Sequence, residues 1–173
     1  MDDRKMIRDA QTAVVRMMEA YGDSIVRLCC LYLKDANLAQ DAAQETFLKA
    51  FRHYESFRGE SSEKTWLTRI ALRTCRDMTR GAWYRLVDRS VTPESVSPSM
   101  PDEKADYGEV AEVVMALDEK YRVPILLYYY QELQAKEIAS ILHLPIGTVL
   151  SRLKRGREKI KEQLQKGGVP FWL

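Results

Sequence analysis

The stretch from Leu144 to Arg157 constrains the fold more than any other part of the chain, because its residues divide between two faces of a helix. One face is apolar, with residues at three- and four-residue steps: Val149, Leu153, Gly156, Ile160 and Leu164. The other face carries hydroxyls and cations: Thr148, Ser151, Arg155 and Lys159, with Arg152 beside them. Hydroxyls and cations hold phosphates, and arginine can hydrogen-bond to guanine, so this pattern favours a DNA groove.

A shorter helical pattern precedes this stretch. Residues 137–142 have apolar side chains spaced for burial, and Pro145 then disfavours helical geometry at Leu144. A short helix, a tight turn and a basic second helix predict a helix-turn-helix. The alternative is a charged amphipathic helix in an ordinary bundle. Six cations between Arg152 and Lys161 face only Glu158 and Glu162, which argues against that alternative because few of these charges can pair within the helix.

Length and composition set broad limits. The 173 residues suffice for one domain or two small ones, and no strand-like alternation is visible, so we expect an all-α fold. The net charge of +2 is modest, so an argument for nucleic-acid binding depends on local patches.

The three cysteines, Cys29, Cys30 and Cys75, form an odd count without metal-binding spacing. We therefore expect free thiols, no metal site and a reducing compartment. The N-terminus lacks an apolar signal core, and no apolar run approaches the ~20 residues that span a bilayer, which predicts a cytoplasmic protein.

The first half of the chain predicts four helices. The first covers residues 6–20, and Tyr21–Ser24 separates it from a second at residues 25–33. Asn37 is the expected cap of the third helix, which extends to about Tyr54. The core side of the third helix is expected to hold Leu38, Ala39, Ala42, Ala43, Phe47, Ala50, Phe51 and Tyr54.

The opposite side of the third helix carries one leucine among polar residues: Asp41, Gln44, Glu45, Leu48 and Arg52. A single exposed leucine needs no explanation. An apolar residue inside a polar rim is also typical of a protein–protein contact. The pattern leaves both interpretations of Leu48 open.

The fourth helix, residues 63–80, follows a loop at Ser56–Ser62 in which Ser61 or Ser62 is the expected cap. Its arginines fall within an arc of about 60°: Arg69, Arg73, Arg76 and Arg80. Its expected buried stripe lies opposite: Leu67, Ile70, Ala71, Thr74, Cys75 and Met78. DNA phosphates would relieve the repulsion between aligned arginines. The alternative is a solvated face paired with acids elsewhere in the fold. Trp66, between the stripes, is either a core residue or a platform for base stacking.

Residues 81–105 are rich in serine and proline and read as a linker. We therefore predict two small helical domains, residues 1–82 and 106–166, joined by a flexible linker at 83–105 and followed by a tail at 167–173. In the second domain, Pro124 is expected in the first turn of its helix, because the backbone N–H groups of the first turn have no hydrogen-bond partner within the helix.

Three motifs in this order resemble one family, the sigma factors of the sigma-70 class in the small extracytoplasmic-function group. Asp41–Phe51 is similar to the family's core-binding segment. Phe57–Ser62 followed by Thr65–Ala71 is similar to the segment that opens and reads the proximal promoter element. Leu144–Arg157 is similar to the recognition helix for the distal element.

The resemblance assigns roles to single residues. Polymerase-binding positions, against the clamp helices of the large subunit, are Asp41, Gln44, Glu45 and Leu48. Positions for the proximal element are Phe57, Arg58, Ser61, Trp66, Arg69, Arg73 and Arg76, with the loop Ser56–Ser62 holding a flipped base. Positions for the distal element are Ser151, Lys154 and Arg155, and the polar face of the same helix adds Thr148, Arg152 and Lys159.

The family implies a factor that binds RNA polymerase core and directs it to promoters through the proximal and distal elements. It also implies an anti-sigma partner. No catalytic cluster, cofactor site or site for a small-molecule substrate is visible, so we expect no enzyme activity. The chain departs from the family at two places. Leu150 stands where the family often has Lys or Arg, so either a phosphate contact is missing or Leu150 contacts a thymine methyl. Gln134-Ala135 stands where the family often has Ser or Thr, which predicts a weaker helix cap.

Two other functions fit the pattern before the resemblance is considered. A conventional helix-turn-helix regulator with a helical dimerisation or sensing domain would bind isolated duplex without polymerase. A helical adaptor that binds protein through Leu48 and the tyrosine-rich helix would show no salt-dependent affinity for DNA.

Overall fold

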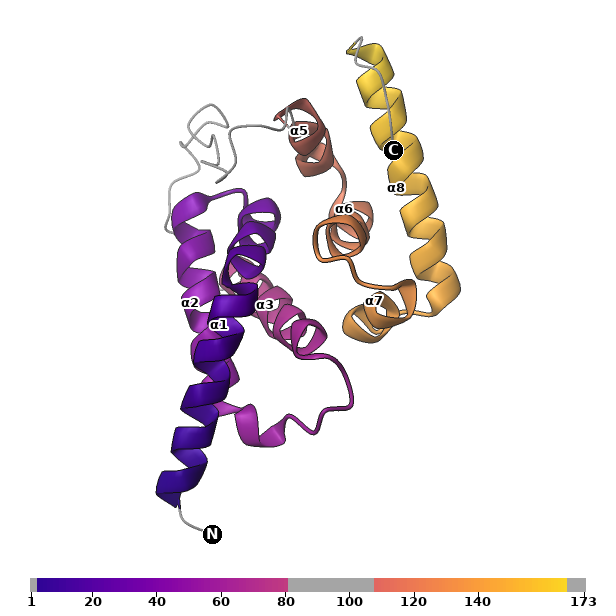
Figure 1. Cartoon of the computed structure of the whole chain (residues 1–173). Coiled ribbons are helices and arrows are strands. Elements are labelled where there is room, and N and C mark those ends of the chain that lie inside the picture. The colour runs from indigo at the N-terminus through magenta and orange to yellow at the C-terminus, as the bar shows by residue number, and fades with distance from the viewer. Residues whose placement is uncertain (1–2, 81–107, 168–173) are drawn as a thin grey trace. The chain divides into compact units, whose positions relative to one another are not determined.

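The computed structural model describes residues 3–80 and 108–167 (Figure 1). Throughout these residues the ordered elements are helices and no strand occurs, which confirms the predicted all-α class. The chain divides into two compact units, Met1–Pro98 and Ser99–Leu173. The predicted linker at 83–105 and the tail beyond Gly167 lie outside the described residues, so the predicted domain boundaries stay predictions. None of the described helices is long and apolar enough to cross a membrane.

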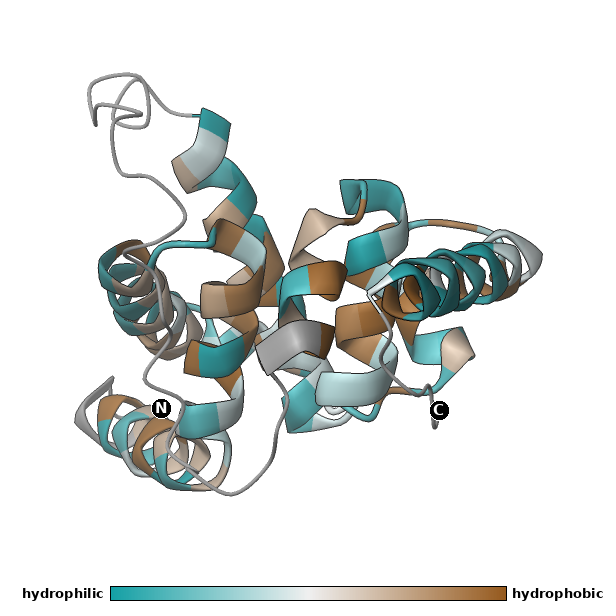
Figure 2. Ribbon diagram, turned by 90° about the horizontal axis from the view of Figure 1, so that it is seen from above, coloured by the Kyte–Doolittle hydropathy of each residue, from teal (hydrophilic) through white to brown (hydrophobic). Residues whose placement is uncertain are grey.

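Within residues 3–80, the first unit contains three α-helices and one short 3-10 helix. These are α1 (Asp3–Leu33), α2 (Ala36–Arg52), η1 (Tyr54–Ser56) and α3 (Glu63–Arg80). The three α-helices pack against one another in pairs, and their shared core includes Met17, Ile25, Leu28, Leu67 and Ala71. Figure 2 shows hydrophobic bands where helices of a unit meet and hydrophilic bands on the outside.

The predicted break at Tyr21–Ser24 is wrong, because α1 continues through it as one helix. Glycine inside a helix costs about 1 kcal/mol relative to alanine. Met17 and Ile25, on either side of Gly22, are both fully buried. Burial of each side chain contributes roughly 1.5–3 kcal/mol, so the packing of a continuous stripe outweighs the local preference for a turn.

The start and the core side of α2 also differ from the prediction. Asp35 caps the helix in place of Asn37, since its carboxylate accepts a hydrogen bond of 2.9 Å from the Leu38 N–H. Phe51 is 38% exposed rather than buried. Thr46 is fully buried instead, and its hydroxyl donates to the Ala42 carbonyl at 2.7 Å.

The second unit contains α5 (Gly108–Ala116), α6 (Glu119–Ile125), the π-helical turn η3 (Leu126–Tyr130), α7 (Ala135–Leu142) and α8 (Ile146–Lys166). Pro124 lies near the end of α6, not in its first turn as predicted. Proline has no N–H to continue the ladder, and the helix widens directly after it. The Gln131 N–H donates to the Leu126 carbonyl, five residues back, at 3.1 Å.

The apolar stripe of α8 is buried at every predicted position: Val149, Leu153, Gly156, Ile160 and Leu164. Gly156 permits a close approach, since a Cβ there would lie 3.0 Å from Ile125 Cγ1. The predicted division of this helix into a buried and an exposed side is therefore confirmed, and α6 supplies the surface against which it packs.

Candidate nucleic-acid interface

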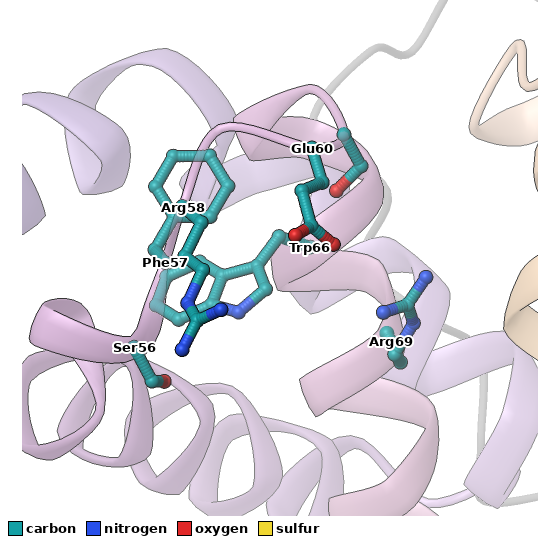
Figure 3. A pocket seen from close by; sticks show the side chains of 7 residues that line it. Ser56, Phe57, Arg58, Glu60, Trp66 and Arg69 are labelled. Atoms are coloured by element: carbon teal, nitrogen blue, oxygen red, sulfur yellow. The ribbon is translucent and has the colours of Figure 1, made fainter.

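The loop before α3 and the first two turns of α3 form a pocket of about 370 Å³. Its lining consists of Ser56, Phe57, Arg58, Glu60, Ser61, Trp66 and Arg69. Figure 3 shows these side chains converging from the loop and from the helix. The pocket therefore brings together five of the residues predicted for the proximal promoter element: Phe57, Arg58, Ser61, Trp66 and Arg69.

Aromatic rings form one wall of this pocket. The ring centroids of Phe57 and Trp66 lie 4.9 Å apart with an interplanar angle of 35°, and both residues are half-buried. Trp66 is thus a pocket residue rather than a fully buried core residue. A planar ring can stack on such a surface, while Arg58 and Arg69 supply positive charge at the same place.

The pocket is held by contacts at the start of α3. The Ser62 hydroxyl accepts a hydrogen bond from the Thr65 N–H at 3.1 Å, so Ser62 rather than Ser61 caps the helix. Glu63 in the first turn pairs with Arg16 of α1, where Arg16 Nη1 lies 2.9 Å from Glu63 Oε2. Gly59 adopts a φ of 71°, a conformation that glycine accommodates without strain and that turns the loop.

Arg73 and Arg76 continue the arginine stripe beyond the pocket. Arg76 is ten residues past Trp66, which corresponds to roughly 15 Å along a helix. Arg73 is exposed and Arg76 half-buried, and within residues 3–80 and 108–167 no ion pair joins either of them to an acid. Asp77 lies 3.9 Å from Lys49 of α2 instead. Among the described residues, Asp77 therefore does not neutralise Arg73 or Arg76.

The buried side of α3 is close to the prediction. Leu67, Ala71, Thr74 and Cys75 are buried as expected, while Ile70 and Met78 are half-buried. Cys75 also raises the pKa of the Cys29 thiol, through a hydrogen bond and through shared burial. The raised pKa makes the buried Cys29 thiol unreactive, so Cys29 acts as a core residue.

The predicted polymerase-binding side of α2 is solvent-facing. Asp41 and Gln44 are exposed, and Leu48 is 49% exposed. Glu45 is half-buried and lies 4.0 Å from Lys49 Nζ and 3.9 Å from Arg52 Nη1. This side of α2 thus presents the half-exposed Leu48 inside a polar rim, with the partly exposed Phe51 three residues farther along the helix.

The predicted helix-turn-helix forms in the second unit. α7 ends at Leu142, His143 adopts a left-handed conformation with a φ of 53°, and Pro145 precedes α8. The start of α7 is better secured than its sequence suggests, since the Glu137 carboxylate accepts a hydrogen bond of 2.9 Å from the Gln134 N–H. This is one half of a capping box.

The predicted distal-element residues lie on the outer side of α8. Ser151, Lys154 and Arg155 are exposed, and Thr148 and Arg152 are half-buried. Lys159 is also exposed, but its Nζ lies 5.6 Å from the centroid of the Tyr121 ring. Lys159 is therefore engaged within its own unit, whereas the other five lie within the first ten residues of the helix.

Ser56 and Glu60 also line the pocket. Both lie in the loop predicted to hold a flipped base, but neither was predicted as a single contact residue. Glu60 has no role of its own among the single residues predicted for the proximal element. Its place between Arg58 and Ser61 in a loop already assigned to the pocket is the signal that could have found it.

The sequence matches the family model for sigma-70 region 2 over residues 17–85 and that for sigma-70 region 4 over residues 107–160. It is 31% identical over 173 residues to the ECF RNA polymerase sigma factor SigW of Bacillus subtilis, with 90% of each chain covered. The chain belongs to the extracytoplasmic-function group of the sigma-70 family. A second relative of this sigma factor is the RNA polymerase sigma-H factor of Pseudomonas aeruginosa, 34% identical over 159 residues, covering 84% of this chain and 82% of the relative.

Two solved structures share its fold. One is CnrH in complex with the cytosolic domain of CnrY, with a TM-score of 0.70, 24% identity, and 95% of this chain and 97% of that chain covered. The other is the sigma factor RpoE in complex with the anti-sigma factor NepR from Bartonella quintana, with a TM-score of 0.73, 21% identity, and 91% and 98% covered. The chain is a promoter-specific transcription initiation factor, and a conventional helix-turn-helix regulator is not favoured.

Proposed function

We propose that this sigma factor divides its work among three surfaces. The outer side of α2 binds RNA polymerase core, the pocket before α3 holds an unpaired base of the proximal promoter element, and α8 reads the distal element as duplex. The observation that carries the proposal is the gathering of five predicted residues around one pocket.

The α2 surface has the character of a protein contact. Leu48 is half-exposed beside Asp41, Gln44 and Glu45, so an apolar anchor stands inside a polar rim. We propose the clamp helices of the large polymerase subunit as its partner. An ion pair at the rim contributes little by itself, so Leu48 should contribute most of the binding energy.

The pocket has the character of a site for an extruded base. Its volume lies near the lower end of the range of roughly 300–1,000 Å³ for small-molecule sites, and its wall is aromatic. A base can enter only after it leaves the stack, so a site of this kind favours opened over paired DNA. Arg73 and Arg76, farther along α3, would hold the backbone that flanks the extruded base.

The α8 surface suits intact duplex. Its first ten residues expose hydroxyls and cations on a convex helix, which a major groove of about 12 Å admits. Arg155 and Lys154 are the residues we expect to contact base edges or phosphates, with Ser151 between them and the turn.

The proposed factor supplies no catalytic chemistry of its own and acts in the cytoplasm, where polymerase and DNA meet. A protein partner that covers these surfaces would keep it inactive. An anti-sigma factor is bound in one of the two similar structures, and we propose a partner of that kind here.

The test is a reciprocal pair of variants with the same substitution. Leu48→Glu should abolish co-purification with core polymerase, because it places a charge at the apolar centre of the contact. Leu150→Glu, equally exposed in the second unit, should retain polymerase and lose initiation at selected promoters. Retention of polymerase by Leu48→Glu would contradict the assignment of α2.

A further inference from the structure

Two large apolar side chains stand exposed at the N-terminal end of α8. Ile146 is 50% exposed and Leu150 is 51% exposed. They are four residues apart, so they lie on the same side of the helix with Cβ atoms about 6 Å from each other. They do not belong to the buried core, because Val149 and Leu153 form the contact of this part of α8 with the rest of the unit.

Their position distinguishes them from other exposed apolar residues. A scattered surface leucine carries no information. In a helix-turn-helix, however, the N-terminal residues of the second helix are those that contact base edges. Ser151 and Lys154 flank Leu150 and are exposed, so the apolar pair is continuous with a polar, cationic surface that is complementary to DNA.

We propose that Ile146 and Leu150 read thymine methyl groups in the distal promoter element. The inference rests on the proposed function of α8. The C5-methyl of thymine is the apolar group that a base pair presents in the major groove. A cytosine at the same place would bring an amino group against side chains that offer it no hydrogen bond.

The spacing of the pair sets the length of the sequence that it reads. Four helical residues rise about 6 Å, and neighbouring base pairs are about 3.4 Å apart. The two side chains therefore cover one or two base steps. The distal element should contain thymine at one or two neighbouring pairs, on either strand.

The first experiment selects promoters. Holoenzyme reconstituted from the full chain and core polymerase transcribes a library in which the distal element is randomised, and the transcribed templates are sequenced. Thymine should be enriched at one or two neighbouring pairs. Leu150→Ala and Ile146→Ala should each lose the enrichment at the pair that the truncated side chain contacts, while the preferences at other pairs remain. A selected element without thymine enrichment would overturn the inference.

The second experiment removes only the methyl group. Deoxyuridine replaces the enriched thymine, and the affinity of holoenzyme for the promoter is measured. It should fall on the order of fourfold per methyl with the unaltered chain, the effect of exposing one buried carbon. With the variant, Leu150→Ala or Ile146→Ala, that lost the enrichment at that pair, the same replacement should have no further effect. Deoxyuridine in the spacer between the elements is the control.

The outcomes separate the inference from the function beneath it. Two results overturn the inference and leave the proposed function standing. In the first, the unaltered chain initiates selectively but its affinity does not change when the methyl is removed. In the second, both alanine variants are as sensitive to removal of the methyl as the unaltered chain. A holoenzyme that initiates from no library member overturns both. The inference is supported if the effect of removing the methyl depends on the side chain. A lower stability of an alanine variant does not affect this result, because the affinities of each variant for the two templates are compared with each other.

Discussion

The two units present a cationic helix in different ways. α3 begins after a loop of six residues, 57–62, that folds over its first turns and forms a pocket with them. α8 begins after a turn of three residues, 143–145, and the outer side of its first turns is exposed, while Val149 and Leu153 are buried beneath it. Both helices bury one side and carry arginines on the other. In the proposed function, this difference in the preceding connection suits α3 to enclose one base and α8 to lie in a groove.

The supporting contacts differ in the same sense. The loop before α3 is fixed by the Ser62 cap and by the pair between Arg16 and Glu63, as a preformed pocket requires. The outer side of α8 instead depends on what lies beneath it, namely the close approach of Gly156 to Ile125. Substitutions can therefore separate the two modes.

The largest expected effect comes from Gly156→Leu. A leucine at this position overpacks the contact of α8 with α6 and should lower the free energy of unfolding by about 3 kcal/mol. Chemical denaturation measures this. Gly147→Leu, in the same helix but with open space around its Cβ position, should have little effect. Retained binding of polymerase by Gly156→Leu would show that the damage stays in the second unit. Tolerance of the leucine would refute the close approach.

Arg155→Ala should weaken binding to the distal element by about 1–3 kcal/mol and relax the preference at one base pair. Electrophoretic mobility shifts with holoenzyme on matched and mismatched distal elements measure both quantities. Lys161→Ala, which removes an exposed cation farther along α8, is the control. If the preference is unchanged while affinity falls, Arg155 contacts phosphate alone.

Trp66→Ala should impair promoter opening by about 1–2 kcal/mol and leave recognition of the distal element intact. Stacking contributes roughly 1–3 kcal/mol per base, and Phe57 remains in the pocket, so the lower part of that range is expected. Permanganate reactivity of unpaired thymines reports opening. Trp66→Phe should open promoters almost normally. Normal opening with Trp66→Ala would remove the pocket from the mechanism.

Gly22→Ala should have the smallest effect, a change in the stability of the first unit. A Cβ at position 22 meets no atom within 4 Å, so the substitution should stabilise α1 by about 0.5–1 kcal/mol. Thermal unfolding measures the change. A decrease in stability would indicate a break in α1 at this position.

Sequence patterns predicted the single-sided helices best. The buried residues of α8 follow directly from their spacing, because one continuous stripe admits one orientation toward the core. The errors arose where a local signal competed with packing. Gly22 read as a break, yet buried residues on both sides hold the helix together. The spacing predicted that Phe51 is buried in the core, but Phe51 is partly exposed and the smaller Thr46 of the same helix is buried.

The candidate site was predicted in part for a similar reason. Spacing along α3 identified the arginines, but a pocket needs the loop to fold back, which spacing does not describe. Glu60 entered the lining only through that folding. Likewise, the sequence could not indicate that Asp77 lies beside Lys49 of α2 and does not pair with the arginines of α3.

The most direct test is run-off transcription by core polymerase, with and without the full chain, from promoters in which the proximal and distal elements are changed separately. The account predicts initiation that requires both elements, with Arg155→Ala insensitive to one base pair of the distal element and Trp66→Ala deficient at the opening step. Polymerase that stays transcriptionally unchanged when the chain is added would contradict the account.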